Sequence, residues 1–320
     1  MNVYLTFDIE IWCNGWSNLD RTFPISFERY VYGRSRHGAY ALPQTLSILN
    51  QYGLKGIFFV EPLFAARFGI KHLEIVVALI REAGHEIQLH LHPEWTDEAI
   101  VPIIENSAIK RQHLSYYTLD EQAKLIATGK KMLEAAGSGP ITAFRAGSYA
   151  ANRDTFEALN RNGILLDFSL NRCFAVSAPE LRTQNSFNSA FEVHGVMTYP
   201  VTIIKDGFSR DRPAQVGACG LAEFRSALAS AEASGTSDFV VVSHNFEMLK
   251  SGSSEPDWIV VKRFQGLCAH LAGHSQQYTV KGCDVSMQER TVTRQPLSQP
   301  EANYFATIWR HAEQIWRRLL

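Results

Sequence analysis

Short apolar runs alternate with longer amphipathic stretches along most of the chain. The short runs predict strands at residues 3–8, 56–60, 86–91, 141–146, 164–169, 197–204 and 238–244. Apolar residues at helical spacing predict helices at residues 41–52, 71–83, 119–136, 152–162, 221–234 and 257–272. This alternation is typical of a mainly parallel sheet with helices outside it, either a barrel or an open doubly wound sheet. We therefore predict an α/β fold.

Local signals mark the ends of these elements. Four glycines follow a predicted helix and precede the next strand, where glycine commonly ends a helix: Gly53, Gly84, Gly137 and Gly163. Residues 118–122, TLDEQ, resemble a capping box at a helix start. Residues 11–40, between the first strand and the first helix, have the character of a loop insertion.

We predict one barrel domain over residues 1–284, followed by a polar linker and a last helix within residues 285–320. The last helix has one apolar side, opposite its arginines: Phe305, Ile308, Trp309, Ala312, Ile315, Trp316 and Leu319. We expect this side to pack on the body of the protein. A homodimer contact or a contact with a membrane surface is the alternative.

Composition narrows the class of protein. The 320 residues are 46% hydrophobic and have a formal net charge of -1, so nucleic acid is not indicated as a partner. The five cysteines are scattered without a C-x-x-C spacing, as in reduced thiols. No secretory leader and no transmembrane segment is indicated, which favours a cytoplasmic protein.

Ionisable side chains stand at the ends of five predicted strands. They are Asp8 with Glu10, His90 with His92, Arg145, Asp167 and His244. Parallel α/β folds build their active sites at the carboxyl ends of the strands, which meet at one edge. The pattern therefore predicts an enzyme.

The segment HEIQLHLHPEW, residues 85–95, indicates a metal site. Gln88, His90 and His92 share one face of the predicted strand, and Pro93 favours an extended conformation at His92. Two imidazoles beside carboxylates are natural ligands of Zn²⁺ or a similar divalent ion. His244, after three valines, is either a core residue or one member of an acid–base pair.

Placed in order, these segments resemble the motifs of the polysaccharide deacetylase family, metal-dependent carbohydrate esterases that share the NodB homology domain. TFDIE resembles the first motif, T-F-D-D-G, and GHEIQLHLHPEW resembles the second, G-H-E-I-x-x-H-x-x-x-H. FRAGSY, ILLDFSL and VVSH resemble the third to fifth, and GLKGIFFV resembles the family's second strand. The resemblance covers roughly residues 1–275 and implies a distorted (β/α) barrel of about seven parallel strands.

The resemblance also implies an activity. It is the hydrolysis of an N-acetyl or other N-acyl group on a carbohydrate or a sugar-linked intermediate of cell-surface polysaccharide synthesis. The cofactor is a divalent metal, Zn²⁺ first, with Co²⁺, Ni²⁺ or Mn²⁺ as alternatives. Asp8 becomes the general base and His244 the general acid; Arg145 orients Asp8, Asp167 holds His244, and the backbone N–H near Tyr149 stabilises the oxyanion.

Two positions depart from the usual motifs. Ile9 replaces the aspartate that usually binds the metal, and Glu10 is its substitute, as in a branch of the family that writes the motif D-x-[DE]. The distal histidine of the second motif falls on Glu94. Either His92 or Glu94 therefore completes the metal site with Glu10 and His90.

Aromatic side chains near the predicted site suit stacking on sugar rings, and we expect Trp12, Trp95 and Tyr149 to contact substrate. Two other functions stay open. One is hydrolysis of another C–N amide, such as a lipid-linked formamido sugar or a cyclic ureide or imide. The other is a non-catalytic carbohydrate-binding relative. A metal-free serine hydrolase is not indicated, since no G-x-S-x-G motif is present.

Overall fold

The computed structural model describes residues 1–105, 109–181, 188–288 and 299–319. The chain forms two compact units. The first unit comprises Met1–Gly56, Ile204–Lys281 and Ser298–Leu320, and the second comprises Ile57–Ile203 and Gly282–Leu297.

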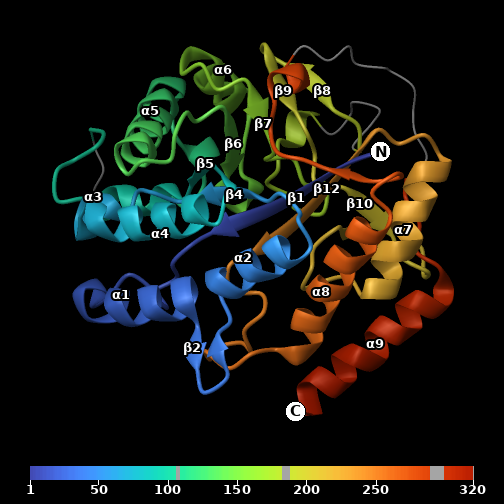
Figure 1. Ribbon diagram of the computed structural model, residues 1–320. Helices are drawn as coiled ribbons and strands as arrows, with labels where there is room; N and C mark the ends of the chain where they lie inside the picture. Colours follow the sequence, from blue (N-terminus) through green and yellow to red (C-terminus); the bar gives the residue numbers. More distant parts are fainter. Residues whose placement is uncertain (106–108, 182–187, 289–298, 320) are drawn as a thin grey trace. The chain divides into compact units, whose positions relative to one another are not determined.

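The first unit is built on two long parallel strands, β1 and β12, which pair from Asn2 opposite Asp238 to Asp8 opposite His244. Both strands are buried at nearly every position, as in parallel sheets covered on both faces. Helix α8 packs against α7 and α2 (Figure 1). The elements of this unit are β1 (Asn2–Ile9), α1 (Leu19–Phe27), a π-helix (Glu28–Tyr32), β2 (Arg34–Ser35), β3 (Gly38–Ala39), α2 (Leu42–Gln51), β10 (Ile203–Lys205), β11 (Asp211–Pro213), α7 (Leu221–Ala233), β12 (Asp238–His244), α8 (Trp258–Gly273), β13 (Thr279–Val280) and α9 (Tyr304–Leu319).

The second unit has the strand order β4-β5-β6-β7-β9-β8, parallel except for the last pair. Helix α5 packs on β5, α4 and α6. The elements are β4 (Ile57–Val60), α3 (Ala65–Phe68), α4 (Ile70–Glu82), β5 (Glu86–Leu91), a 3₁₀ helix (Pro93–Glu98), a 3₁₀ helix (Leu114–Tyr116), α5 (Leu119–Ala135), β6 (Ala143–Ala146), a 3₁₀ turn (Gly147–Tyr149), α6 (Arg153–Arg161), β7 (Leu166–Asp167), a 3₁₀ turn (Pro179–Leu181), β8 (Phe191–Val193), β9 (Val196–Thr198) and a 3₁₀ turn (Val285–Met287).

The predicted helices and six of the seven predicted strands are present, most within a few residues of the predicted ends. The single strand predicted at residues 197–204 is wrong, because the chain there forms β9 (Val196–Thr198) and β10 (Ile203–Lys205), which belong to different sheets. The capping box at Thr118 is confirmed, and the four glycines have left-handed backbone conformations. The prediction of a loop over residues 11–40 is wrong, because Leu19, Phe23 and Phe27 form the buried side of helix α1. Of the predicted linker, residues 289–298 lie outside the described part of the chain.

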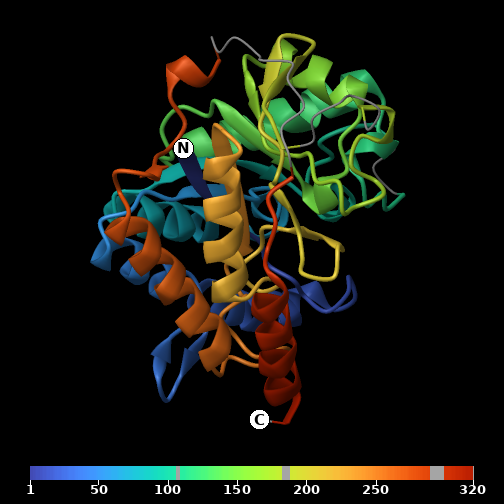
Figure 2. The same ribbon diagram turned by 90° about the vertical axis from the view of Figure 1, so that its right-hand side faces the viewer.

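Helix α9 packs on α7 in the first unit (Figure 2). It does so through its polar side, since Thr307 and Arg310 are buried whereas Phe305 and Trp309 are exposed. The expectation that the apolar side would pack on the protein is therefore wrong. Among the described residues, none of the helices has the length and apolar character needed to cross a membrane.

Candidate active site

The first unit brings together Asp8, Glu10 and His244. The parallel register puts Asp8, near the end of β1, directly beside His244 at the end of β12. All three have ligand atoms within 4.8 Å of one another, and His244 Nε2 lies 3.9 Å from Asp8 Oδ2. Asp8 and Glu10 are buried, with 2% and 6% exposure. Two carboxylates and an imidazole in this arrangement suit proton transfer.

Glu247 holds the other nitrogen of His244, at 2.8 Å from Nδ1 to Oε1. Its carboxylate also accepts hydrogen bonds from Gln215 Nε2, the Gly217 N–H and Ser243 Oγ. A Cβ atom at Gly217 would lie 2.9 Å from Glu247 Oε2, so a larger residue there would require the Glu247 carboxylate to shift. The sequence analysis did not single out Glu247, which lies in the turn three residues after His244.

The charge state of His244 follows from this setting. Burial lowers its pKa, but the hydrogen bond to Glu247 and the charges of Glu10, Glu247 and Asp8 outweigh burial and raise the pKa to about 9. His244 is therefore protonated at neutral pH and can donate a proton through Nε2.

Asn245 fixes the backbone of Glu10. Its side-chain oxygen accepts from the Glu10 N–H at 3.2 Å, and its amide donates to the Glu10 carbonyl at 3.0 Å and to the Tyr30 carbonyl. The Trp12 indole donates to Glu10 Oε2 at 2.6 Å. Asn245 therefore holds the backbone of Glu10, and Trp12 holds its carboxylate.

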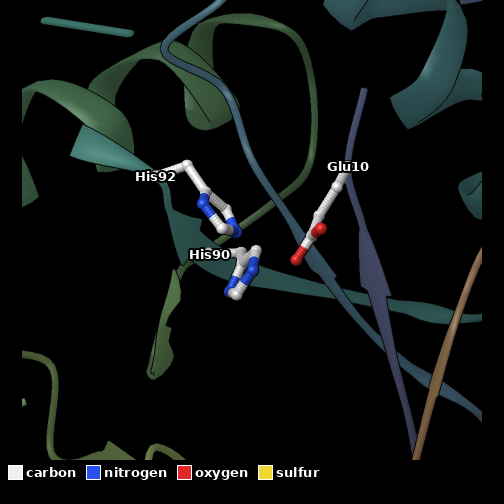
Figure 3. Close-up of side chains that lie close together, drawn as sticks. All are labelled: Glu10, His90 and His92. Carbon is white, nitrogen blue, oxygen red and sulfur yellow. The ribbon is translucent and has the colours of Figure 1, made fainter. Parts of the chain in front are cut away.

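The second unit places His90 and His92 side by side at the end of β5, with ring centroids 4.9 Å apart (Figure 3). His90 Nδ1 lies 2.8 Å from the Arg145 carbonyl, and His92 Nδ1 lies 3.2 Å from Glu94 Oε1. When Nδ1 donates to these acceptors, Nε2 of each neutral ring retains a lone pair. Metal-binding histidines typically have this second hydrogen bond, which sets the tautomer and the ring orientation.

Gly147 allows the close packing behind these rings. A Cβ atom there would lie 2.6 Å from the Leu91 carbonyl oxygen and 2.9 Å from the His92 ring. The two following residues, Ser148 and Tyr149, both have left-handed backbone conformations, with φ of 53° and 57°. Such conformations of non-glycine residues are strained and are common at functional sites.

Two carboxylates flank His92. Glu94 is buried, and its Oε2 has no hydrogen-bond partner among the described residues. Glu61, directly after β4, accepts from the N–H groups of Leu63 and Phe64. Burial raises the pKa of Glu61 to about 8, even though these hydrogen bonds and His92 act to lower it. The sequence analysis missed Glu61, although it follows a strand in the same way as the residues that were chosen.

Asp167 is fully buried among hydroxyl donors of the second unit. It accepts hydrogen bonds from the Ser169 N–H, Ser169 Oγ and Thr198 Oγ1. Burial raises its pKa, while these hydrogen bonds and the charge of Arg145 act to lower it. Arg145 is also fully buried; its Nε donates to the Phe168 carbonyl.

The predicted substrate aromatics differ in exposure. Trp12 is 37% exposed. Trp95 is buried, and its ring packs edge-on against Phe64 and Phe68. Tyr149 is also buried, with its ring beside Phe174. Trp12 is thus the one of the three with a substantial exposed surface.

Comparison with known families agrees with these residues. The polysaccharide deacetylase family model matches residues 2–166, which include the ends of β1 and β5. The chain belongs to the polysaccharide deacetylase family. No match was found among curated proteins.

Solved structures support the fold of this polysaccharide deacetylase. A Mycobacterium smegmatis protein assigned as a polysaccharide deacetylase is 20% identical, with a TM-score of 0.58 over 92% of this chain and 94% of that one. A 4-alpha-glucanotransferase from Thermococcus litoralis is 11% identical, with a TM-score of 0.55 over 92% of this chain and 41% of that one. The predicted fold class, a NodB-like (β/α) barrel with a C-terminal helix, is confirmed.

Proposed function

We propose that this polysaccharide deacetylase uses a divalent metal to hydrolyse the N-acetyl, or another N-acyl, group of a carbohydrate. The observation that supports it best is the pair His90 and His92. Both rings are buried and have Nδ1 held by an oxygen acceptor, as metal ligands usually do. Two core histidines that bind no metal would not require an oxygen acceptor at Nδ1 of both rings.

We assign the metal to Glu10, His90 and His92, the ligand set that the resemblance of the first two motifs implies. Two imidazoles and one carboxylate form a donor set that suits Zn²⁺, and also Co²⁺, Ni²⁺ or Mn²⁺. Between the two alternatives for the third ligand we choose His92. Glu94 Oε1 already accepts from His92 Nδ1, so Glu94 fits the role of orienting that ring.

The bound ion would supply Lewis-acid activation of the amide carbonyl and of a water molecule. Asp8 is proposed as the base that takes the proton of this water. His244 is proposed as the acid whose Nε2 proton passes to the leaving nitrogen, which departs as an amine while the acyl group leaves as a carboxylate. The pairing of buried Asp8 with half-buried, positively charged His244 supports a split into base and acid.

Glu247 and Tyr149 complete the proposal. Glu247 keeps His244 in its charged form and directs Nε2, the role that the resemblance gave to Asp167. The Tyr149 backbone N–H is proposed as a donor to the developing oxyanion, and the strained backbone at Ser148 and Tyr149 supports it. Trp12 is proposed to contact the sugar, because part of its ring is exposed beside Glu10.

Metal analysis and hydrolysis assays on the same preparations test the proposal. We expect His90→Ala to lose both the metal and the activity, and Asp8→Asn to keep the metal and lose activity. His72→Ala, on helix α4, is the control and is expected to change neither. Full activity in His90→Ala or Asp8→Asn would show that the mechanism is wrong. Release of acetate, release of formate and ring opening of a cyclic imide distinguish the acyl groups.

A further inference from the structure

Helix α9 is attached to the first unit by a buried ionic contact. Arg310 is completely buried, its Nε donates to Glu223 Oε1 at 3.0 Å, and its Nη2 donates to Asp206 Oδ2 at 3.2 Å. Thr307, one turn earlier, donates to the same Glu223 oxygen at 2.8 Å. These contacts fix which side of the helix faces the protein.

Two further ion pairs extend this attachment along the helix. Arg263 on α8 donates twice to Glu313 Oε2, and Arg317 pairs with Asp257, the N-cap residue of α8. The polar side of α9 is therefore engaged over three turns, and the helix cannot rotate its other side inward without breaking all of these contacts.

The opposite side of α9 is apolar and exposed. We call it the α9 stripe, and its exposed fractions are Phe305 79%, Ile308 42%, Trp309 64%, Ile315 62% and Trp316 64%. With about 150–250 Å² for each aromatic side chain, the stripe leaves on the order of 500 Å² of apolar surface uncovered. Contiguous apolar patches of this size usually mark an interaction site.

The spacing of the stripe indicates what covers it. Phe305, Ile308, Ala312 and Ile315 alternate steps of three and four residues, the seam of a helix that pairs with another helix. Ala312, in the middle, is small enough for two backbones to approach closely. Two stripes facing each other bury on the order of 1,000 Å² in total, about the minimum for a specific interface.

We propose that the α9 stripe binds the α9 stripe of a second copy of this chain, antiparallel about a two-fold axis near Ala312. That axis places Trp309 opposite the partner's Ile315, and Ile308 opposite the partner's Trp316. Each large ring then meets a smaller side chain, and the same patch serves both copies, as a two-fold interface requires. Antiparallel pairing also opposes the two helix dipoles favourably.

The charges of the helix favour a protein partner over a lipid surface. A helix that lies on an anionic membrane has free lysines or arginines beside its apolar side. The described arginine side chains of α9 are Arg310 and Arg317, and both are paired with carboxylates of the first unit.

Sedimentation equilibrium of the full chain tests the proposal. We expect the wild type to sediment at twice the chain mass at micromolar concentration. Trp309→Glu and Ile315→Glu, each placing two charges in one interface, are expected to raise the dissociation constant by 100-fold or more. Ile25→Glu, at a similarly exposed position on α1, is the matched control and should leave the dimer unchanged. Circular dichroism confirms that each variant is folded.

Cross-linking tests the orientation without depending on stability. In a Cys173→Ser background, Ala312→Cys is expected to form a disulfide between copies, whereas Phe305→Cys is not, because antiparallel helices carry those residues to opposite ends. Cross-linking of Phe305→Cys alone would overturn the antiparallel arrangement. A monomeric wild type would overturn the proposal. If that monomer also binds anionic phospholipid vesicles, the α9 stripe contacts a membrane surface instead.

Discussion

Replacement of Glu247 by glutamine keeps the length of the side chain and removes its charge. In the native protein, Oε1 accepts from Gln215 and His244, and Oε2 accepts from Gly217 and Ser243. An amide has one oxygen, so two of these four donors would face an NH₂ group. His244 then loses either its hydrogen bond or, at the least, the charge that stabilises its protonated form.

The two effects differ in size. A buried donor left without an acceptor costs about 1–3 kcal/mol, and the donors to Glu247 are only part-buried, so loss of two of them should lower the free energy of unfolding by about 2–4 kcal/mol. General acid catalysis accelerates a reaction by about 10²–10⁴-fold. Most of this acceleration is lost when the imidazole of His244 is no longer held in the correct orientation. We therefore expect kcat of Glu247→Gln to fall by about 10²–10³, with the metal content unchanged.

The pH dependence of kcat is the diagnostic measurement. The pKa of His244, about 9, is raised above the ordinary histidine value, so the acid is charged below that pH and loses its proton as the pH rises through it. Without the Glu247 charge this pKa falls, and the alkaline limb of the profile moves to lower pH. Glu255→Gln, which changes a partly exposed carboxylate of the same unit, should leave the profile unchanged.

The variant Asp167→Asn tests whether Asp167, instead of Glu247, supports His244. If the family role applies unchanged, Asp167 and not Glu247 supports His244. A shift of the alkaline limb in Asp167→Asn, together with a wild-type profile in Glu247→Gln, would refute our assignment. We expect Asp167→Asn to lower the melting temperature, because its oxygens accept three buried hydrogen bonds, and to leave the limb in place.

Three other substitutions test the surroundings of the metal ligands. Glu94→Gln should weaken metal affinity about 10–100-fold without abolishing binding, by equilibrium dialysis, because Glu94 orients His92; complete loss would make Glu94 a ligand. Gly147→Ala should destabilise the protein by about 1–3 kcal/mol in chemical unfolding, since the added methyl group meets the His92 ring. Asn245→Leu should lower metal affinity about 10–100-fold, because it frees the backbone of Glu10; an unchanged affinity would contradict this role.

The regular elements could be predicted because buried parallel strands are nearly continuous apolar runs. β1, β4 and β12 are apolar over most of their length, whereas β5 alternates apolar and polar residues, and glycines with positive φ end the helices between the strands. Helix α1 could not be predicted in this way. Its apolar residues are four apart, but Pro24 lies inside the helix and Asn18 starts it in a left-handed conformation.

The site residues that could be predicted are the ionisable side chains at the carboxyl ends of predicted strands. That rule selected Asp8, His90 and His244, and it would have selected Glu61 if applied to β4 as well. Glu247 is different, since it lies in the turn after β12 and reaches His244 through local backbone geometry. A strand pattern in the sequence does not indicate such a residue. Its role becomes evident only in the structure, where four donors surround the Glu247 carboxylate.

The end of β12 links the proposed acid to the proposed metal ligand. His244 faces Asp8, its neighbour Asn245 clamps the backbone of Glu10, and Glu247 holds His244 from the other side. Because β1 and β12 are in parallel register, a shift of β12 by one residue would displace all of these contacts together. Point substitutions act separately, since the Asn245 side chain bonds to the backbone of Glu10 and not to His244, whereas the Glu247 carboxylate bonds to His244 and not to Glu10. We therefore expect weaker metal binding in Asn245→Leu, and a lower kcat with the metal retained in Glu247→Gln.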